Sequence, residues 1–175
     1  MDSSEFLGFL SSRTSIRSYR EETLDPGALA YMLSCASSAP SAGNLESWDV
    51  VVVTEPGTKE ALSEAALDQP HIREAPVVLV VGANYVRAMS RYGDRGILYA
   101  VCDASIACTY MMLAAHALGL GSCWTGAFDD EDVRDVLGLP QHVRPVALLA
   151  VGHGEQTSGM TSRLPVEEHV HLEAW

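Results

Sequence analysis

Residues 97–120 form a long apolar stretch that strongly limits what this chain can fold into. A helix of this length is long enough to cross a lipid bilayer. However, the stretch contains Asp103 and His116, is rich in Ala, Cys, Ser and Thr, and leads into Gly119-Leu120-Gly121. Because polar and ionisable groups are costly in lipid, we interpret it as the buried core helix of a globular domain.

The rest of the chain predicts several helices around a few buried strands. Runs of β-branched and other apolar residues, typical of central strands, occur at 48–54, 77–82, 122–125 and 146–151. Helical patterns with capping residues occur at 3–11, 26–39, 59–67, 95–118 and 129–138. No repeat or low-complexity linker divides the chain. We therefore expect one α/β or α+β domain over residues 1–175, with residues 155–175 as a polar C-terminal arm.

Charge and cysteine content restrict the partners and the compartment. The chain has 23 acidic and 11 basic residues, a formal net charge of −12, which argues against a nucleic-acid partner. No secretory signal or membrane segment is expected at the N-terminus. The cysteines, at positions 35, 102, 108 and 123, have no CxxC spacing, so we expect reduced thiols in a cytoplasmic protein. The pair His169 and His171 lacks a third ligand, and no metal site is predicted.

The basic residues are unusual because all but Lys59 are arginines, and three arginines cluster at positions 13, 17 and 20. In an extended chain Arg13, Ser15 and Arg17 project to the same side. Two planar guanidinium groups and a hydroxyl suit a phosphate. The cluster thus predicts a small-anion site, although an arginine-rich genome or a salt-adapted surface also explains the composition.

Three other segments have the residues of a binding loop, although each is also compatible with an ordinary loop. Residues 39–48 are small and polar, so backbone can approach a planar ligand there, and Asn44 can both donate and accept hydrogen bonds. The others are residues 121–128 and 161–165. No phosphate loop or serine-nucleophile elbow is present. A dinucleotide fingerprint at Gly119-Leu120-Gly121 is rejected because Trp124 replaces its third glycine and a helix precedes it.

In their order and spacing, these segments resemble the FMN-dependent nitroreductase family over nearly the whole chain. Gln69 and Ala75-Pro76 before a strand, and residues 92–96 before the long helix, extend the similarity. The resemblance implies an α+β fold with a central, mostly antiparallel sheet flanked by helices. It also implies a homodimer with two FMN sites at the subunit interface. NADH or NADPH would pass electrons through FMN to a small acceptor such as a nitroaromatic compound or a quinone.

The same resemblance implies the cofactor-binding residues and assigns no catalytic acid or base, because the flavin carries the chemistry. These residues are Arg13, Thr14, Ser15, Arg17, Pro40, Ser41, Asn44, Gln69, Trp124, Thr125, Gly126 and Arg163. Arg13 and Arg163 would hold the phosphate, and Thr14 and Ser15 the phosphate or ribityl chain. Arg17 would lie near the N1/O2 edge of the ring and tune it electrostatically.

The ring itself would be contacted by other segments. Ser41 and Asn44 would contribute from the partner subunit or from the loop of the same chain. Thr125 and Gly126 would present backbone near N5 and O4, and Gln69 would lie on the pyrimidine side. All of these roles are carried over by motif match.

Three positions depart from the family pattern. Glu46-Ser47 precedes Trp48 where many members have Gln-Pro, Thr161 stands where some have lysine, and Arg17 where several have lysine. Alternatives also remain: a flavin-modifying or dehalogenating relative, an FMN-carrying or phosphate-binding module without turnover, and a non-flavin domain with arginine loops. A dehalogenating relative would need a lid, for which residues 72–95 leave little room.

Overall fold

A four-stranded sheet forms the centre of the computed structural model, which describes residues 2–154 and 162–175. The strands are β1 (Trp48–Val53), β2 (Val77–Asn84), β3 (Gly121–Thr125) and β4 (Val143–Gly152). Their order is β1-β2-β4-β3, and every pairing is antiparallel. The predicted α+β fold with an antiparallel sheet is confirmed.

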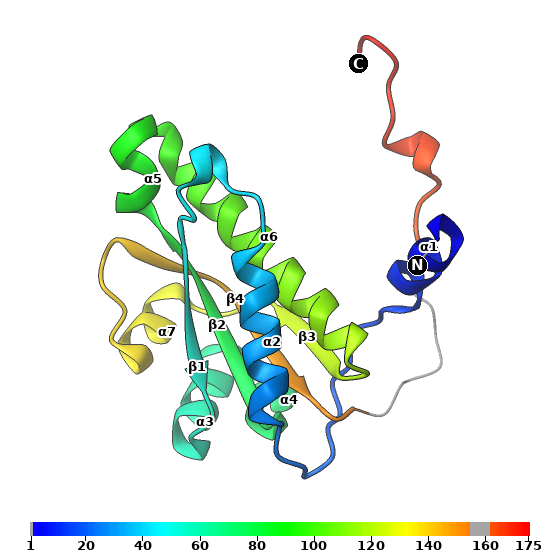
Figure 1. The fold of residues 1–175 in the computed structure, drawn as a ribbon. Helices are drawn as coiled ribbons and strands as arrows, with labels where there is room; N and C mark the ends of the chain where they lie inside the picture. Colours follow the sequence, from blue (N-terminus) through cyan, green and yellow to red (C-terminus); the bar gives the residue numbers. More distant parts are fainter. Residues whose placement is uncertain (1, 155–161) are drawn as a thin grey trace.

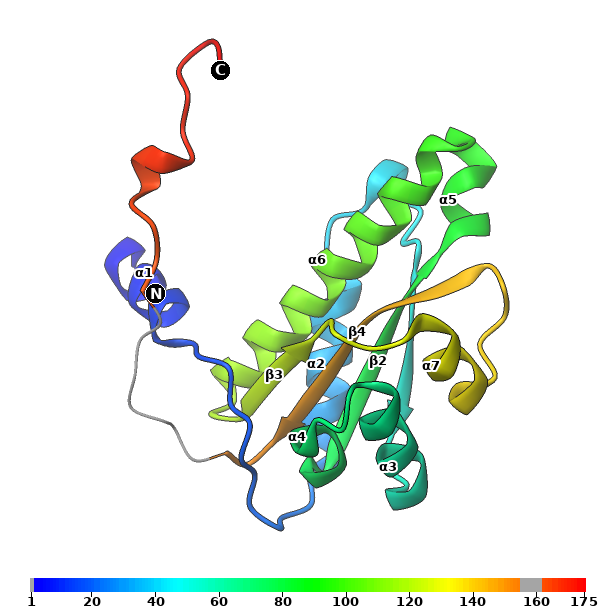
Figure 2. The ribbon, with the colours of Figure 1, turned by 180° about the vertical axis from the view of Figure 1, so that it is seen from behind.

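Helices cover both faces of the sheet, so β2 is buried along its whole length. One face carries the long helix α6 (Arg95–Ala117) and α2 (Pro26–Ser37) (Figure 1). The other carries α3 (Pro56–Ala65), α4 (Pro70–Glu74) and α7 (Asp130–Leu137) (Figure 2). Alternate residues of a strand point to opposite faces, which explains why the continuous valine-rich run of β2 is buried on both sides. The valine run of β1 is only partly buried, with Val52 39% exposed, because β1 is an edge strand and not the central strand that its sequence predicts.

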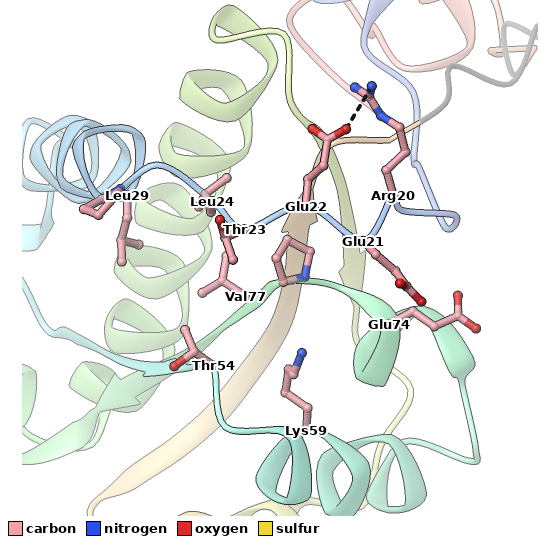
Figure 3. A pocket seen from close by; sticks show the side chains of 12 residues that line it. Arg20, Glu21, Glu22, Thr23, Leu24, Leu29, Thr54, Lys59, Glu74 and Val77 are labelled. Carbon is pink, nitrogen blue, oxygen red and sulfur yellow. Dashed lines mark ion pairs between the residues drawn. The ribbon is translucent and has the colours of Figure 1, made fainter.

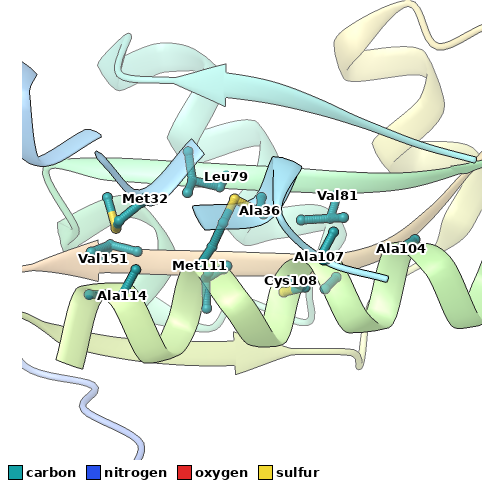
Figure 4. Packing of buried hydrophobic residues seen from close by; sticks show 14 of the residues in the cluster. Met32, Ala36, Leu79, Val81, Ala104, Ala107, Cys108, Met111, Ala114 and Val151 are labelled. Atoms are coloured by element: carbon teal, nitrogen blue, oxygen red, sulfur yellow. The ribbon is translucent and has the colours of Figure 1, made fainter. Parts of the chain in front are cut away.

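Small side chains bring α6 close to the sheet, as Figure 4 shows. Ala104, Ala107 and Met111 of α6 pack with Met32 of α2 and with the sheet, and all four are fully buried. By length and composition α6 could cross a membrane. Its packing here confirms the interpretation of the apolar stretch as a core helix.

The element bounds differ from the sequence expectation in several places. Helix α3 begins three residues earlier than expected, at Pro56, because Glu55 caps it by accepting a hydrogen bond from the Thr58 amide. Strand β4 begins before Val146 despite Pro145, because a register irregularity at Gly82 accommodates the proline. Strand β2 continues two residues beyond the expected 82, to Asn84, and the short helix α4 was not predicted.

Three further elements were not predicted from the sequence. They are the helix α5 (Tyr85–Tyr92) and short 3-10 turns at Ala42–Asn44 and Val166–Glu168. Tyr85, Ala88, Met89 and Tyr92 of α5 do recur at helical spacing, but the pattern spans only about two turns, and Ala88 alone is fully buried among the residues of this helix.

The first helix, α1 (Ser3–Ser12), and the described part of the tail lie apart from the sheet (Figures 1 and 2). No residue of α1 is buried, and residues 162–175 are all exposed. A contact of 2.9 Å between Ser12 Oγ and His116 Nε2 connects α1 to the C-terminal end of α6. This end of α6 therefore lies next to the arginine-rich segment that follows α1.

Candidate functional site

The arginine-rich segment lies along the outer edge of β3. The Ile16 amide donates to the Ser122 carbonyl at 2.9 Å, and Ser15 forms a parallel bridge with Ser122. The Ile16 side chain is buried against Gly121, where an added Cβ would lie within 3.0 Å of it. This close approach requires glycine at position 121, and it fixes the segment on the sheet edge.

Because Ile16 points inward, its neighbours face away from the sheet edge. Arg13 is half-buried and Arg17 is exposed, and neither guanidinium forms an ion pair within the described part of the chain. Arg20, by contrast, pairs with Glu22 at 3.2 Å. Two uncompensated positive charges in so acidic a chain are what an anionic ligand would need.

A small cavity opens beside these arginines. It has a volume of about 60 Å³ and is lined by Arg13, Thr14, His116 and Ser122 among others. Hydroxyl groups and a guanidinium therefore meet at one place, at the junction of the segment with β3. Arg13 and Thr14, two of the residues predicted to bind the phosphate, are among the residues that line it.

His71 of α4, a buried histidine that was not predicted as a site residue, lies next to Thr125 at the end of β3. His71 Nε2 is 2.7 Å from Thr125 Oγ1, and both side chains are buried. Burial lowers the pKa of His71 below its ordinary value, and the positive charge of Arg17 lowers it further. Arg17 and Thr125 thus belong to one electrostatic environment, and His71 is part of it.

The remaining expected residues of this region have defined partners. The Gln69 amide nitrogen donates to the carbonyls of Ala66 and Ala127, at 2.8 and 3.1 Å. It thereby connects the end of α3 to the loop after β3. Trp124 is half-buried against the core, and Gly126 is exposed.

Residues 39–47 lie elsewhere, near the N-terminal part of α6. The Asp103 carboxylate accepts hydrogen bonds from the Ala42 amide at 2.9 Å and the Ser47 amide at 3.2 Å. Asp103 and His116 are both on α6, and the helical rise separates them by about 20 Å. One chain therefore does not bring Ser41 and Asn44 to the arginine-rich segment.

The loop has an unusual backbone. Gly43, Asn44 and Glu46 have φ angles of 59°, 58° and 47°. Inside the loop, Ser41 Oγ accepts a hydrogen bond from the Glu46 amide at 3.0 Å. Pro40, Gly43 and Asn44 are exposed, so part of the loop is accessible to a ligand.

Arg163 belongs to the exposed tail. Its Nη1 donates to the Ser162 carbonyl at 3.4 Å. The described tail starts beside α1 in both views (Figures 1 and 2). The expected departure at Thr161 lies outside the described residues.

A larger cavity, of about 510 Å³, lies away from these groups, between residues 20–24 and α3 (Figure 3). Lys59 extends from α3 into this region, and its Nζ donates to the Ala75 carbonyl at 2.7 Å. Burial lowers the pKa of Lys59. Within the described residues, no group of three or more His, Cys, Asp or Glu side chains could hold a metal ion.

His71→Gln is expected to weaken the pH dependence of stability in mildly acidic solution. The pKa of His71 is below 6.5 in the folded chain, so the unfolded state binds more protons as the pH falls below about 6.5. Stability is therefore lost on acidification, with a slope of at most about 1.4 kcal/mol per pH unit from this group. Urea unfolding between about pH 7.5 and 5 measures the slope.

Exposed His142 provides the matched control. His142→Gln leaves the buried contact between His71 and Thr125 intact, so the pH dependence that comes from this contact should remain. A His71→Gln variant with the wild-type slope would show that His71 is freely protonated in the folded chain.

The chain is similar to known proteins over most of its length. A model of the nitroreductase family matches residues 10–72 and 59–153. A protein of Thermus thermophilus named NADH dehydrogenase is 37% identical, over 90% of this chain and 91% of its own length. The FMN reductase [NAD(P)H] of Bacillus subtilis is 32% identical, over 98% of this chain and 74% of its own.

Solved structures give the same result. NfrA2 of B. megaterium is 30% identical with a TM-score of 0.90, covering 100% of this chain and 76% of that chain. YcnD of Bacillus subtilis is 31% identical with a TM-score of 0.90, over 100% of this chain and 75% of that chain. Sequence and fold together establish that the chain belongs to the nitroreductase family.

Proposed function

We propose that the protein is an FMN-dependent oxidoreductase that takes electrons from NADH or NADPH and passes them to nitroaromatic compounds, quinones or similar small acceptors. The observation that carries this proposal is the pair of guanidiniums, Arg13 and Arg17, that have no ion-pair partner among residues 2–154 and 162–175 and lie at the edge of β3 in a chain of net charge −12. The names of relatives, FMN reductase and NADPH nitroreductase among them, support the same activity.

The residues at this edge fit a flavin mononucleotide. Arg13, with Thr14 and Ser15 beside it, would bind the phosphate through charge-assisted hydrogen bonds, and Arg163 would join from the tail. Arg17 would stabilise negative charge at the ring. When bound, FMN supplies the redox chemistry, which explains why no catalytic acid–base pair is needed.

We further propose a cytoplasmic homodimer in which the 39–47 loop serves the site of the partner subunit. The separation of this loop from Arg13 along α6 supports that arrangement. Apolar side chains left uncovered in one chain also support it, including Phe6 and Leu7 of α1 and Leu172 and Trp175 of the tail. The site is complete only when a second copy supplies its loop.

An open site is favoured over a covered one. Between Ile72 and Arg95 the chain is almost entirely in α4, β2 and α5, which leaves no long loop to form a lid. This supports the proposed reduction of varied small acceptors rather than a dehalogenating reaction inside a closed site.

The absorption spectrum of the purified protein, followed by anaerobic titration, tests the proposal. We expect a yellow protein that NADH or NADPH bleaches and that nitrofuran or menadione recolours. The more effective donor in the titration identifies the nicotinamide preference. A yellow protein that neither donor bleaches would indicate a flavin carrier without turnover, and a colourless protein that takes up no added FMN would refute a flavin site.

A further inference from the structure

We infer that Asp103 is a positioning residue that holds the 41–47 loop in the conformation needed to bind flavin. The expected effect on flavin binding rests on the proposed function, whereas the hydrogen bonds between Asp103 and the loop lie within one chain. Asp103 is 2% exposed and lies in the middle of α6, on a helix whose other buried side chains are mostly small and apolar. A charge in this position requires an explanation.

The two carboxylate oxygens have separate partners at the two ends of the loop. Oδ1 accepts from the Ala42 amide at 2.9 Å, and Oδ2 accepts from the Ser47 amide at 3.2 Å. Asp103 forms no ion pair with any residue in the described ranges. The burial of the charge is therefore compensated by backbone amides of this loop.

Between these two hydrogen bonds the backbone is strained. Asn44 and Glu46 adopt positive φ angles, a conformation that side chains other than glycine rarely occupy. Such conformations persist only where the surrounding structure determines them. An added Cβ at Gly43 would collide with Tyr92 Oη, so the turn is also closely packed against α5.

The other side of the loop is held by α5. Arg91 Nη1 donates to the Gly43 carbonyl at 3.3 Å, and Arg87 Nη1 donates to the Glu46 carbonyl. The arginines thus bind the loop carbonyls, while Asp103 accepts from the loop amides. Asp103 accepts hydrogen bonds from both loop amides, so replacing it removes the hydrogen bonds described here between the loop and α6.

This arrangement explains why a carboxylate is needed. A carboxylate accepts hydrogen bonds at both oxygens, whereas an amide accepts at one and donates at the other. In Asp103→Asn, one of the two loop amides would face the donor Nδ2. The side chain keeps its volume, so packing in α6 changes little.

The experiment compares three variants. Asp103→Asn removes one acceptor from the helix side. Ala42→Pro removes one donor from the loop side, and Ser41, with ψ of 156°, is already in the conformation that a following proline requires. Cys108→Ser introduces a polar group at a fully buried position on the same helix without touching the loop, and it serves as the control.

Three measurements are made on each variant: hydrogen exchange of the 41–48 backbone without FMN, FMN affinity, and the visible circular dichroism of bound FMN. We expect faster exchange, a changed dichroism band and about 10- to 100-fold weaker FMN binding for Asp103→Asn and for Ala42→Pro. The double variant should bind FMN with nearly the same affinity as the weaker-binding single variant, because both changes remove parts of one contact. Cys108→Ser should lower thermal stability and leave all three loop readouts unchanged.

The possible failures are distinguishable. If wild-type protein takes up no FMN, the proposed function is overturned. If the wild type binds FMN and both loop variants bind it equally well with an unchanged dichroism band, only the positioning role is overturned. If Asp103→Asn does not fold, Ala42→Pro decides the question, because it leaves the helix sequence intact.

Discussion

Arg13→Ala is expected to weaken FMN binding by about 10- to 100-fold and to leave riboflavin binding nearly unchanged. A hydrogen bond between charged groups contributes about 1.5–3 kcal/mol, and about 1.4 kcal/mol corresponds to a tenfold change in affinity. Riboflavin has the same ring and ribityl chain but no phosphate, so it does not depend on a phosphate-binding arginine. Titration of both flavins, followed by quenching of their fluorescence, gives the two affinities.

Arg20→Ala is the matched control, because Arg20 is in the same segment but pairs with Glu22. It should bind FMN with nearly wild-type affinity, since exposed ion pairs contribute little. Equal losses for FMN and riboflavin in Arg13→Ala would place Arg13 near the ring or in the fold rather than at the phosphate.

The contacts of the arginine side chains separate arginines that have structural partners from those that do not. Several arginines have structural partners: Arg87 pairs with Asp49 at 2.9 Å, Arg144 with Asp130 at 2.8 Å, and Arg134 donates to the Pro140 carbonyl at 2.9 Å. Arg13 and Arg17 have no such partner within the described ranges. A general preference for arginine explains the composition but not why these two remain uncompensated.

The position of Arg13 and Arg17 also explains how so acidic a chain could bind anions. A net charge of −12 repels both FMN and NAD(P)H at long range. At physiological ionic strength, screening limits this repulsion to about 8 Å, so two nearby guanidiniums determine the local interaction. Binding of these anions therefore depends on short-range contacts at the edge of β3.

Most of the fold could be predicted from local patterns. The strands containing Val50–Val53 and Val77–Val81 are continuous apolar runs made mostly of valine, and α2 and α7 carry clear caps at Asp25 and Asp129. Helix α5 was missing from the prediction although Tyr85, Ala88, Met89 and Tyr92 recur at helical spacing. The pattern lasts only about two turns, which is short for a helix to be stable by itself, and in the structure α5 packs against α6.

The site could be predicted only in part, for a physical reason. Its motifs identify segments, but the contacts within it join residues far apart in the sequence. His71 and Thr125 are 2.7 Å apart across two elements, and Asp103 meets Ala42 and Ser47 across the space between α6 and the loop. An aspartate within an apolar helix was a visible signal for Asp103, whereas its partners are backbone amides without a sequence pattern.

Mixing two impaired variants should restore activity if the partner subunit completes each site. Arg13→Ala and Asn44→Ala would each damage both sites of a homodimer. In a mixed dimer, the unaltered Arg13 of one chain meets the unaltered Asn44 of the other at one site, and the second site carries both changes. Dimers purified by two different tags on the two chains should therefore show about half of the wild-type FMN content and NAD(P)H oxidation rate.

A site built within one chain predicts a different result. Each chain of the mixed dimer would then carry one damaging change in its own site, and neither FMN content nor rate would rise above that of the parent variants. The control dimer combines Arg13→Ala with a chain carrying both changes. It contains no unaltered Arg13 and should show no recovery under either arrangement, so recovery confined to the first mixture requires that Arg13 and Asn44 act across the subunit interface. The roughly 20 Å separation along α6 is the reason to expect that outcome, because neither segment can reach the other without moving the core helix.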